Sequence, residues 1–249
     1  MEHRIGTAGW SLPREQQPRF PTGDSHLARY AQVLNAVEIN STFHRSHRPA
    51  TYERWAATVP DTFQFSIKLP RAITHYSGLV RTQGLLDAFF AEIAPLGEKA
   101  GCLLVQLPPK LEFTLRTARS FVAALRDRFD KGIAIEPRHA SWFNQHADRM
   151  LEALRVTRVV ADPLRSPEGA EPGGWKGLAY FRLHGSPRTY YSSYTDEYLD
   201  QLAERLRALG HQRVDTWCIF DNTTLGAGTA NALDLQARLA PSLTRDAKD

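Results

Sequence analysis

The sequence predicts an α/β protein of the (β/α)8 TIM-barrel class, regular or irregular, formed as a single domain over residues 1–240. Three observations support this fold class. Short apolar runs alternate with longer amphipathic runs, and about eight such units fit the chain length of 249 residues. Nearly every apolar run ends in polar residues, as expected when the loops after eight strands surround one opening. No glycine-rich phosphate loop follows the first strand, which disfavours a doubly wound open sheet.

The predicted strands are short and rich in β-branched and aromatic residues, as parallel strands buried on both faces should be. The runs are RIGTAG (4–9), AVEIN (36–40), FQFSIK (63–68), CLLVQL (102–107), IAIEP (133–137), RVVAD (158–162), AYFRLH (179–184) and TWCIFD (216–221).

The predicted helices lie between these runs and have recognisable ends. Thr195 can cap a helix whose first turn is acidic and which ends near Gly210, and Pro49 suits the first turn of another helix. The predicted helices cover 24–35, 49–58, 85–97, 115–129, 195–210 and 230–239. The segment 163–175 contains too much Pro and Gly for a regular helix, so we expect an irregular loop, and residues 241–249 are expected to form a flexible tail.

Composition places weak limits on function. The net charge of +4 and the isoelectric point of about 9.2 permit an anionic partner but do not demonstrate one. Cys102 and Cys218 lie inside apolar runs without C-x-x-C spacing, so buried thiols are expected. The N-terminal residues lack the apolar region of a signal peptide, and no run approaches the roughly 20 apolar residues of a membrane span. We therefore expect a soluble cytoplasmic protein with no membrane partner.

The strand ends carry the functional signal. Because residues two apart in a strand share a face, Glu136 and Arg138 point the same way, and so do Arg182 and His184. Buried ion pairs that only stabilise the interior are the plain alternative. Burying a charge costs several kcal/mol even when it is paired, so repeating it on strand after strand favours a functional reason. The same reasoning assigns strand-end positions to Glu38, Asn40, Lys68, Gln106, Asp162 and either Asp221 or Asn222.

These residue types predict an enzyme that binds an anionic ligand at the opening. Guanidinium and ammonium groups suit a phosphate or carboxylate, and nearby acids and imidazoles suit proton transfer. The predicted catalytic residues are Glu136, Glu38, His139, His184 and Asp162. The predicted ligand-binding residues are Lys68, Arg138, Arg182, Asn40, Gln106, Asn222 and His75, with Trp142 and Tyr190 stacking on the ligand or covering it.

Three alternatives stay open. No metal or other cofactor is favoured, because three interspersed cations would repel a metal; a divalent metal would use Glu38, Glu136 and Asp162. A metal-dependent nuclease or phosphodiesterase acting on nucleic acid, and a non-catalytic ligand-binding protein, are the alternative functions. The turn FDNTTLGAGTANA (220–232) is either an anion site or an ordinary capped turn.

The strand-end motifs together resemble the YecE-like family of TIM-barrel proteins, a domain-of-unknown-function family. The matching stretches are GTAGW (6–10), VEINSTFHR (37–45), FQFSIKLPRAITH (63–75), QLPPKLEF (106–113), IEPRHASWF (135–143), ADP (161–163), YFRLHG (180–185) and FDNTTLGAGTANA (220–232). They span nearly the whole chain in order. The resemblance implies the TIM-barrel fold and supplies no reaction.

Overall fold

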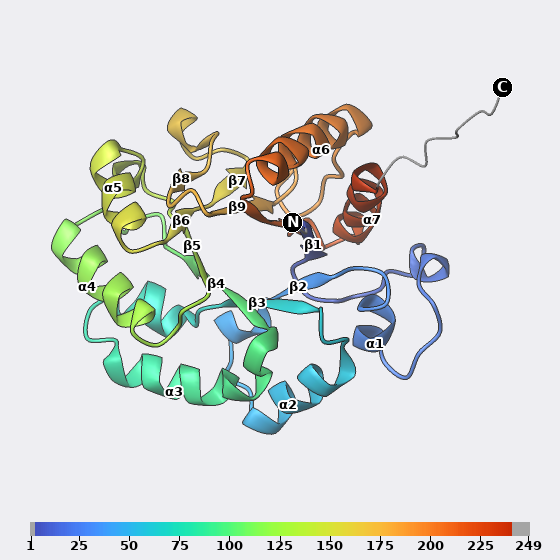
Figure 1. Cartoon of the computed structure of the whole chain (residues 1–249), viewed down its shortest axis with the longest axis horizontal. Coiled ribbons are helices and arrows are strands. Elements are labelled where there is room, and N and C mark those ends of the chain that lie inside the picture. Colours follow the sequence, from blue (N-terminus) through green and yellow to red (C-terminus); the bar gives the residue numbers. More distant parts are fainter. Residues whose placement is uncertain (1–2, 241–249) are drawn as a thin grey trace.

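The computed structural model describes residues 3–240, and its strands form two hydrogen-bonded sheets enclosed by helices (Figure 1). The smaller sheet has the order β1 (His3–Thr7), β10 (Asp215–Phe220), β9 (Leu178–Leu183) and β7 (Val160–Asp162), all parallel. The larger sheet has the order β2 (Ala36–Ile39), β3 (Gln64–Lys68), β4 (Ala100–Gln106), β5 (Gly132–Glu136), β6 (Thr157–Arg158) and β8 (Gly173–Gly174). Only β8 runs antiparallel to its neighbour.

The two sheets meet at two seams. At one seam a single segment serves both sheets: β6 pairs with β5, and β7, which begins one residue after Val159, pairs with β9. At the other seam an isolated bridge joins Ala8 to Glu38, supported by a hydrogen bond from Gly9 N to the Glu38 carbonyl of 2.9 Å. The structure is therefore an α/β fold of parallel sheets, while the expected barrel is not closed by one continuous ladder.

All eight predicted apolar runs lie on strands, and their order along the chain is as expected. The run 158–162 is divided because its two parts bond to different sheets. The strand β8 was not predicted; it falls in the Pro- and Gly-rich segment, which is otherwise irregular apart from the short turn Pro167–Gly169. The predicted tail at 241–249 lies outside the described residues.

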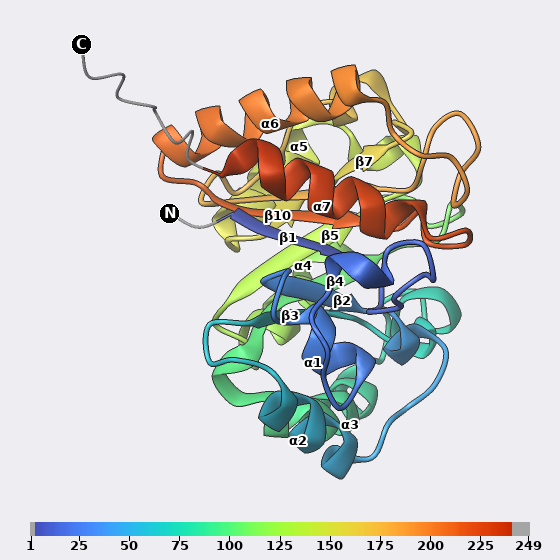
Figure 2. The same ribbon diagram turned by 90° about the vertical axis from the view of Figure 1, so that its right-hand side faces the viewer.

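The helices cover the outer faces of both sheets. They are α1 (His26–Tyr30), α2 (Pro49–Thr58), α3 (Gln83–Ile93), α4 (Leu115–Arg126), α5 (Gln145–Ala153), α6 (Asp196–His211) and α7 (Ala227–Leu239). Figure 2 shows α6 and α7 side by side over β1 and β10, in agreement with the contacts between these elements.

Capping residues explain where several helices begin. Thr195 accepts a hydrogen bond from Tyr198 N at 3.3 Å before the acidic first turn of α6, as the sequence predicts. The helix α5 was not predicted. Its cap is Asn144, which accepts hydrogen bonds from His146 N and Ala147 N at 2.9 and 3.0 Å. The buried residues Ala147, Met150 and Leu151 are the apolar pattern that could have revealed it.

Side chains on the inner faces of the sheets are apolar in the middle of the strands and become ionic toward their carboxyl ends. The apolar inner cluster includes Ala36, Cys102, Leu104, Ala134, Ala161, Tyr180, Trp217 and Ile219. A larger apolar core separates the strands from the helices, and Cys218 belongs to it.

Both cysteines are free and buried as predicted, and burial raises the pKa of each thiol. Over residues 3–240, no helix has the length and apolar character needed to cross a membrane.

Candidate active site

Seven ionisable side chains gather at the carboxyl ends of the strands, and Arg182 on β9 lies at their centre. Its Nε and Nη2 donate to Glu38 Oε2 and Oε1 at 2.9 and 2.7 Å, and its Nη1 donates to Glu136 Oε2 at 3.2 Å. Its Nη2 also lies 3.1 Å from Asp221 Oδ2. The name Arg182 cluster is used below for the set Glu38, Lys68, Glu136, Arg138, Arg182, His184 and Asp221.

His184 connects two of these carboxylates. Its Nδ1 lies 2.9 Å from Asp221 Oδ2 and its Nε2 lies 3.2 Å from Glu136 Oε1. A ring that donates to an acceptor at both nitrogens must be the charged imidazolium. Burial alone would lower the pKa of His184, but Glu136 and Asp221 outweigh it and raise that pKa above its ordinary value.

The carboxylates of the Arg182 cluster are held in their charged form. Burial alone would raise the pKa of Glu136, but Arg182 and His184 hold it well below its usual range. The pKa of Asp221 is also lowered, because Arg182 and His184 outweigh its burial. Glu136 is therefore an ionised acceptor at neutral pH and not a proton donor, while the raised pKa of His184 favours its protonated form.

A layer of hydroxyl groups supports Glu38 from below. Tyr180 Oη donates to Glu38 Oε2 at 3.2 Å and lies 2.9 Å from Ser66 Oγ. Tyr180 precedes Arg182 by two residues, so both point inward from β9. The orientation of Glu38 is thus fixed by Arg182 on one side and Tyr180 on the other.

Lys68, at the end of β3, differs from the other cations of the cluster. No hydrogen bond or ion pair within residues 3–240 uses its amino group, which lies 4.1 Å from the centre of the Phe43 ring. Its side chain is 5% exposed. Burial and the neighbouring Arg182 lower the pKa of Lys68 to about 8, although Glu38, Glu136 and Asp221 act in the opposite direction.

Arg138 and Tyr190 form the outer edge of the cluster. Arg138 donates from Nε and Nη2 to Glu136 Oε1 at 3.2 and 3.1 Å. Burial alone would lower the pKa of Arg138, but Glu136 and the nearby Tyr190 raise it. Tyr190 is exposed and lies edge-on to His184 with ring centres 5.7 Å apart. The structure therefore places Tyr190 beside the ionic residues of the Arg182 cluster.

Three further predicted residues lie around the cluster. Asn40 and Lys68 each come directly after the paired residues Ile39 and Ile67, and within residues 3–240 the enclosed Asn40 Oδ1 has no hydrogen-bond partner. Gln106 ends β4 opposite Glu136 and is buried. His75 packs edge-on against Phe43, with ring centres 4.9 Å apart, and burial followed by Lys68 lowers its pKa. A ligand that donates a hydrogen bond would satisfy the Asn40 oxygen.

Asp162 and Asn222 do not join the cluster, contrary to the prediction. Asp162 Oδ2 accepts a hydrogen bond from Tyr194 Oη at 2.7 Å. Because Ala161 pairs with Arg182 on the inner face, the next residue points outward. Asn222 Nδ2 donates to the Ser192 carbonyl at 2.9 Å and to Asn231 Oδ1 at 3.0 Å, and its Oδ1 is enclosed without a partner. Asn222 therefore connects the loop at Ser192 to Asn231 of α7. Because side chains alternate along β10 and beyond its end, Asp221 is the residue that points inward.

His139 and Trp142 also point elsewhere. His139 Nδ1 lies 2.8 Å from Ser141 Oγ, and its Nε2 lies 3.9 Å from Glu112 Oε1. Trp142 is 1% exposed, and its Nε1 donates to the Leu111 carbonyl at 2.9 Å. The chain turns at the short helix Ala140–Trp142, which directs Trp142 into the core, so the prediction that it stacks on a ligand is wrong.

The predicted metal set is not assembled. Asp162 faces away, and the guanidinium of Arg182 lies between Glu38 and Glu136, where a cation would have to bind. Among residues 3–240, no group of three or more His, Cys, Asp or Glu side chains is placed to hold a metal ion. The turn before α7 contains a hydrogen bond from Gly228 N to the Asn222 carbonyl of 2.9 Å, and its N-cap residue Gly226 makes no side-chain cap.

Sequence reasoning missed Tyr180 and left open which of Asp221 and Asn222 points inward. The two-residue alternation already places Ser66 on the face of Lys68, and Phe43 follows a strand end as a candidate aromatic contact. Tyr180 shares the inner face with Arg182, so the same alternation could have found it. Phe43 lies in the short helix Ser41–Phe43, where no such periodicity applies. Its proximity to Lys68 depends on the path of the loop.

Comparisons with known proteins agree with this fold. The family described as "Protein of unknown function DUF72" matches residues 4–248. The "UPF0759 protein YunF" of Bacillus subtilis is 22% identical over 256 residues, covering 91% of each chain. A DUF72 family structure from Enterococcus faecalis superposes with a TM-score of 0.79 at 21% identity, covering 96% of this chain and 95% of the other. One from Thermotoga maritima gives 0.75 at 24% identity, covering 96% and 99%. The YecE-like resemblance corresponds coarsely to this family.

Proposed function

The chain belongs to the DUF72 family, and we propose that it is an enzyme that binds a small anionic ligand, containing phosphate or a sugar, at the carboxyl ends of its strands. In this proposal the two sheets act together as an irregular TIM barrel, with the Arg182 cluster at the opening where enzymes of that class have their active sites.

The charge balance of the Arg182 cluster carries the proposal. Its three carboxylates face three cations, and the raised pKa of His184 adds a fourth positive charge. Lys68 contributes one of these charges without a paired carboxylate within 4 Å among the described residues. A buried excess of positive charge costs free energy, and an anion beside Lys68 would remove that cost.

The proposed division of roles follows from the contacts. Lys68 and Arg138 bind the anion, because Lys68 is unpaired and Arg138 lies at the outer edge of the cluster. His184 donates the proton, since its pKa is raised and both its nitrogens face carboxylates. Glu136 positions Arg138 and His184. Glu38 holds Arg182 in place, and Tyr190 covers the ligand.

A thermal-shift screen tests the binding step. Phosphosugars, nucleotides and small carboxylates are added at millimolar concentration and modest salt. A ligand at a hundredfold excess over its dissociation constant should stabilise the folded protein by about 2.7 kcal/mol. The stabilisation should disappear in Lys68→Met and persist in Lys110→Met, which changes an exposed lysine. A response that is equal in both variants, or no response to any ligand class, contradicts the proposal.

Turnover distinguishes an enzyme from a binding protein. A ligand that stabilises the protein is incubated with it, and the reaction is followed by NMR. We expect product formation that is lost in His184→Gln, while binding measured by calorimetry is retained. Binding without turnover over many hours would contradict the enzymatic part of the proposal and leave the binding part standing.

A further inference from the structure

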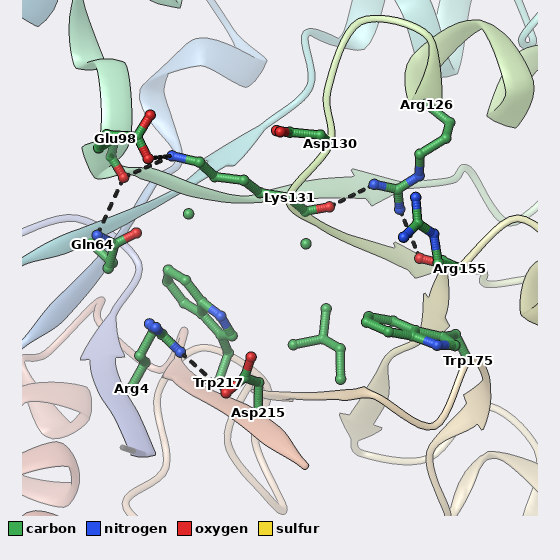
Figure 3. A pocket seen from close by; sticks show the side chains of 13 residues that line it. Arg4, Gln64, Glu98, Arg126, Asp130, Lys131, Arg155, Trp175, Asp215 and Trp217 are labelled. Atoms are coloured by element: carbon green, nitrogen blue, oxygen red, sulfur yellow. Dashed lines mark hydrogen bonds and ion pairs between the residues drawn. The ribbon is translucent and has the colours of Figure 1, made fainter. Parts of the chain in front are cut away.

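A cavity lies at the amino ends of the strands (Figure 3). The Arg182 cluster lies at the carboxyl ends of the same strands. The volume of the cavity is about 410 Å³, within the range of small-molecule sites. The first residues of several strands line it, among them Gln64 of β3, Gly132 of β5 and Leu178 of β9. The cavity is therefore a feature of the strands themselves and not a gap between surface loops.

Two indole rings line this cavity. Trp217 is 2% exposed, and its ring is stacked on Tyr180 with ring centres 6.2 Å apart and planes 8° from parallel. No hydrogen bond among residues 3–240 uses the Trp217 indole N–H, which is left available to a ligand in the cavity. Trp175 is half-buried on another wall. A Cβ at Gly177 would lie 2.2 Å from the Trp175 ring, so the glycine lets this indole lie flat against the backbone.

Gly101 and Gly132 also leave space for the side chains that line the cavity. A Cβ at Gly101 would lie 2.4 Å from Gln64 Oε1 and 2.9 Å from the Trp217 ring. A Cβ at Gly132 would lie 3.2 Å from Leu178. Any larger side chain at Gly101 would displace Gln64 or Trp217, so the glycine maintains the position of the indole at the cavity.

Four cations line the cavity, and their contacts differ. The Arg126 guanidinium connects neighbouring segments of the chain. It donates hydrogen bonds to the backbone carbonyls of Phe129, Lys131, Leu154 and Arg155. Arg155 is exposed, and no hydrogen bond or ion pair among the described residues uses its guanidinium. Figure 3 shows the two guanidinium groups close together, and the charge of Arg155 helps to lower the pKa of Arg126 after burial.

The acidic residues of the cavity only partly offset these charges. Lys131 pairs with Glu98 at 3.0 Å, and Arg4 lies 4.0 Å from Asp215, with acid side chains that are 97% and 54% exposed. Asp130 is exposed, and among the described residues it forms no ion pair within 4 Å with Arg126 or Arg155. Arg155 beside Arg126 is thus the position where an anion would gain most.

We propose that this cavity binds a flat aromatic molecule that carries a carboxylate or phosphate group. The aromatic ring packs against Trp175, which is only half-buried, beside the indole N–H of Trp217, whose ring faces Tyr180 and Arg4. The anionic group binds Arg155 at the edge formed with Arg126. This site is independent of the function proposed for the Arg182 cluster, because the two sets of residues do not overlap.

Isothermal titration calorimetry tests the proposal with a fixed panel: AMP, GMP, UMP and indole-3-acetate, with adenosine and inorganic phosphate as partial ligands. We expect at least one of the first four to bind in the submillimolar range, and both partial ligands to bind at least about tenfold more weakly. Binding should weaken about tenfold or more in Arg155→Asn and in Trp175→Leu.

The matched control is Arg213→Asn. Arg155 and Arg213 both have positive φ, 53° and 62°, and both follow a helix, so asparagine suits the backbone at either position. Arg213 does not line the cavity, and Arg213→Asn should bind as the unchanged protein does. Circular dichroism confirms that each variant is folded, and Trp175→Leu serves if Arg155→Asn is not.

Three outcomes would overturn the proposal. The first is no heat of binding from any panel member at millimolar concentration. The second is equal binding of inorganic phosphate, which would remove the role of the indoles. The third is binding that is lost in Lys68→Met and retained in Arg155→Asn and Trp175→Leu, which would place the ligand at the Arg182 cluster instead.

Discussion

Arg182 and Glu38 form a two-point ion pair, with both nitrogen–oxygen distances below 3 Å at 2.9 and 2.7 Å, and neither side chain has exposed surface. The pair joins β9 of the smaller sheet to β2 of the larger sheet. It therefore connects the two sheets through side chains, in addition to the seams of the backbone.

Removing the charge of Arg182 should destabilise the protein strongly. Arg182→Met leaves Glu38, Glu136 and Asp221 with one cation fewer, and breaking a buried ion pair typically costs about 3–5 kcal/mol. Urea unfolding measures the free energy. The control is Arg238→Met, which removes ion pairs with exposed Asp196 and Asp200 and should cost less than about 1 kcal/mol. Similar losses in both variants would contradict the assigned burial.

The stability contributed by Glu136, Asp221 and His184 should fall on both sides of neutral pH, while loss of the Lys68 proton above about pH 8 acts in the opposite direction. Glu136 and Asp221 have lowered pKa values in the folded protein, so their contribution is present above the ordinary values of 4.5 and 3.8 and is lost as the pH falls through the lowered values. His184 has a raised pKa, so its contribution is complete below 6.5 and is lost as the pH rises through the raised value.

Melting temperature as a function of pH checks these signs, and His184→Gln is the discriminating variant. It should lose the decrease that begins above pH 6.5 and keep the decrease on the acid side. An unchanged alkaline decrease in this variant would show that another group causes it.

Tyr190→Phe should weaken ligand binding without unfolding the protein. The substitution keeps the ring that lies against His184 and removes the hydroxyl group of Tyr190, whose proximity helps to raise the pKa of Arg138. Because Tyr190 is exposed, the loss should be about 1 kcal/mol, or roughly fivefold in the dissociation constant. Calorimetry with a ligand found in the screen measures it; equal affinity would mean that Tyr190 does not contact or orient the bound state.

Asp162→Asn should have the opposite profile. Asp162 bonds to Tyr194 on the outer face of β7, so the change should reduce stability by about 1 kcal/mol and leave ligand affinity unchanged. Urea unfolding and calorimetry on the same preparation separate the two effects. A large loss of ligand affinity with unchanged stability would contradict this and show that Asp162 belongs to the binding site.

The sequence was sufficient for the strands and for most of the Arg182 cluster because both depend on one local rule. Alternation of side chains along a strand places Glu136 and Arg182 on the inner face whatever the loops do. The same rule could not place Asp162, because it does not say which residues of 158–162 point inward. That depends on the division of this run at Val159, after which Ala161 pairs with Arg182 and Asp162 points outward.

Residues beyond the strand ends could not be predicted in this way. His139 and Trp142 follow β5 within a turn, where the direction of each side chain is set by hydrogen bonds to Ser141 and Leu111. The amino-end cavity was not predicted at all. Its residues come from the beginnings of strands, from the end of α4, from the connections that precede strands and from Trp175 in the irregular segment, and no local rule joins these positions.

Lys68 provides the most direct test of the claim that the cluster exists to bind an anion. Its pKa is lowered from 10.5 to about 8, so the charged amino group destabilises the folded state at neutral pH, by roughly 3 kcal/mol at most. Lys68→Met removes this cost and keeps contact with Phe43. The decisive measurement is urea unfolding of Lys68→Met at pH 7, with and without the ligand that stabilises the unchanged protein. We predict a variant that is more stable without ligand and unresponsive to it; a variant that is less stable and still responds to the ligand would contradict the account.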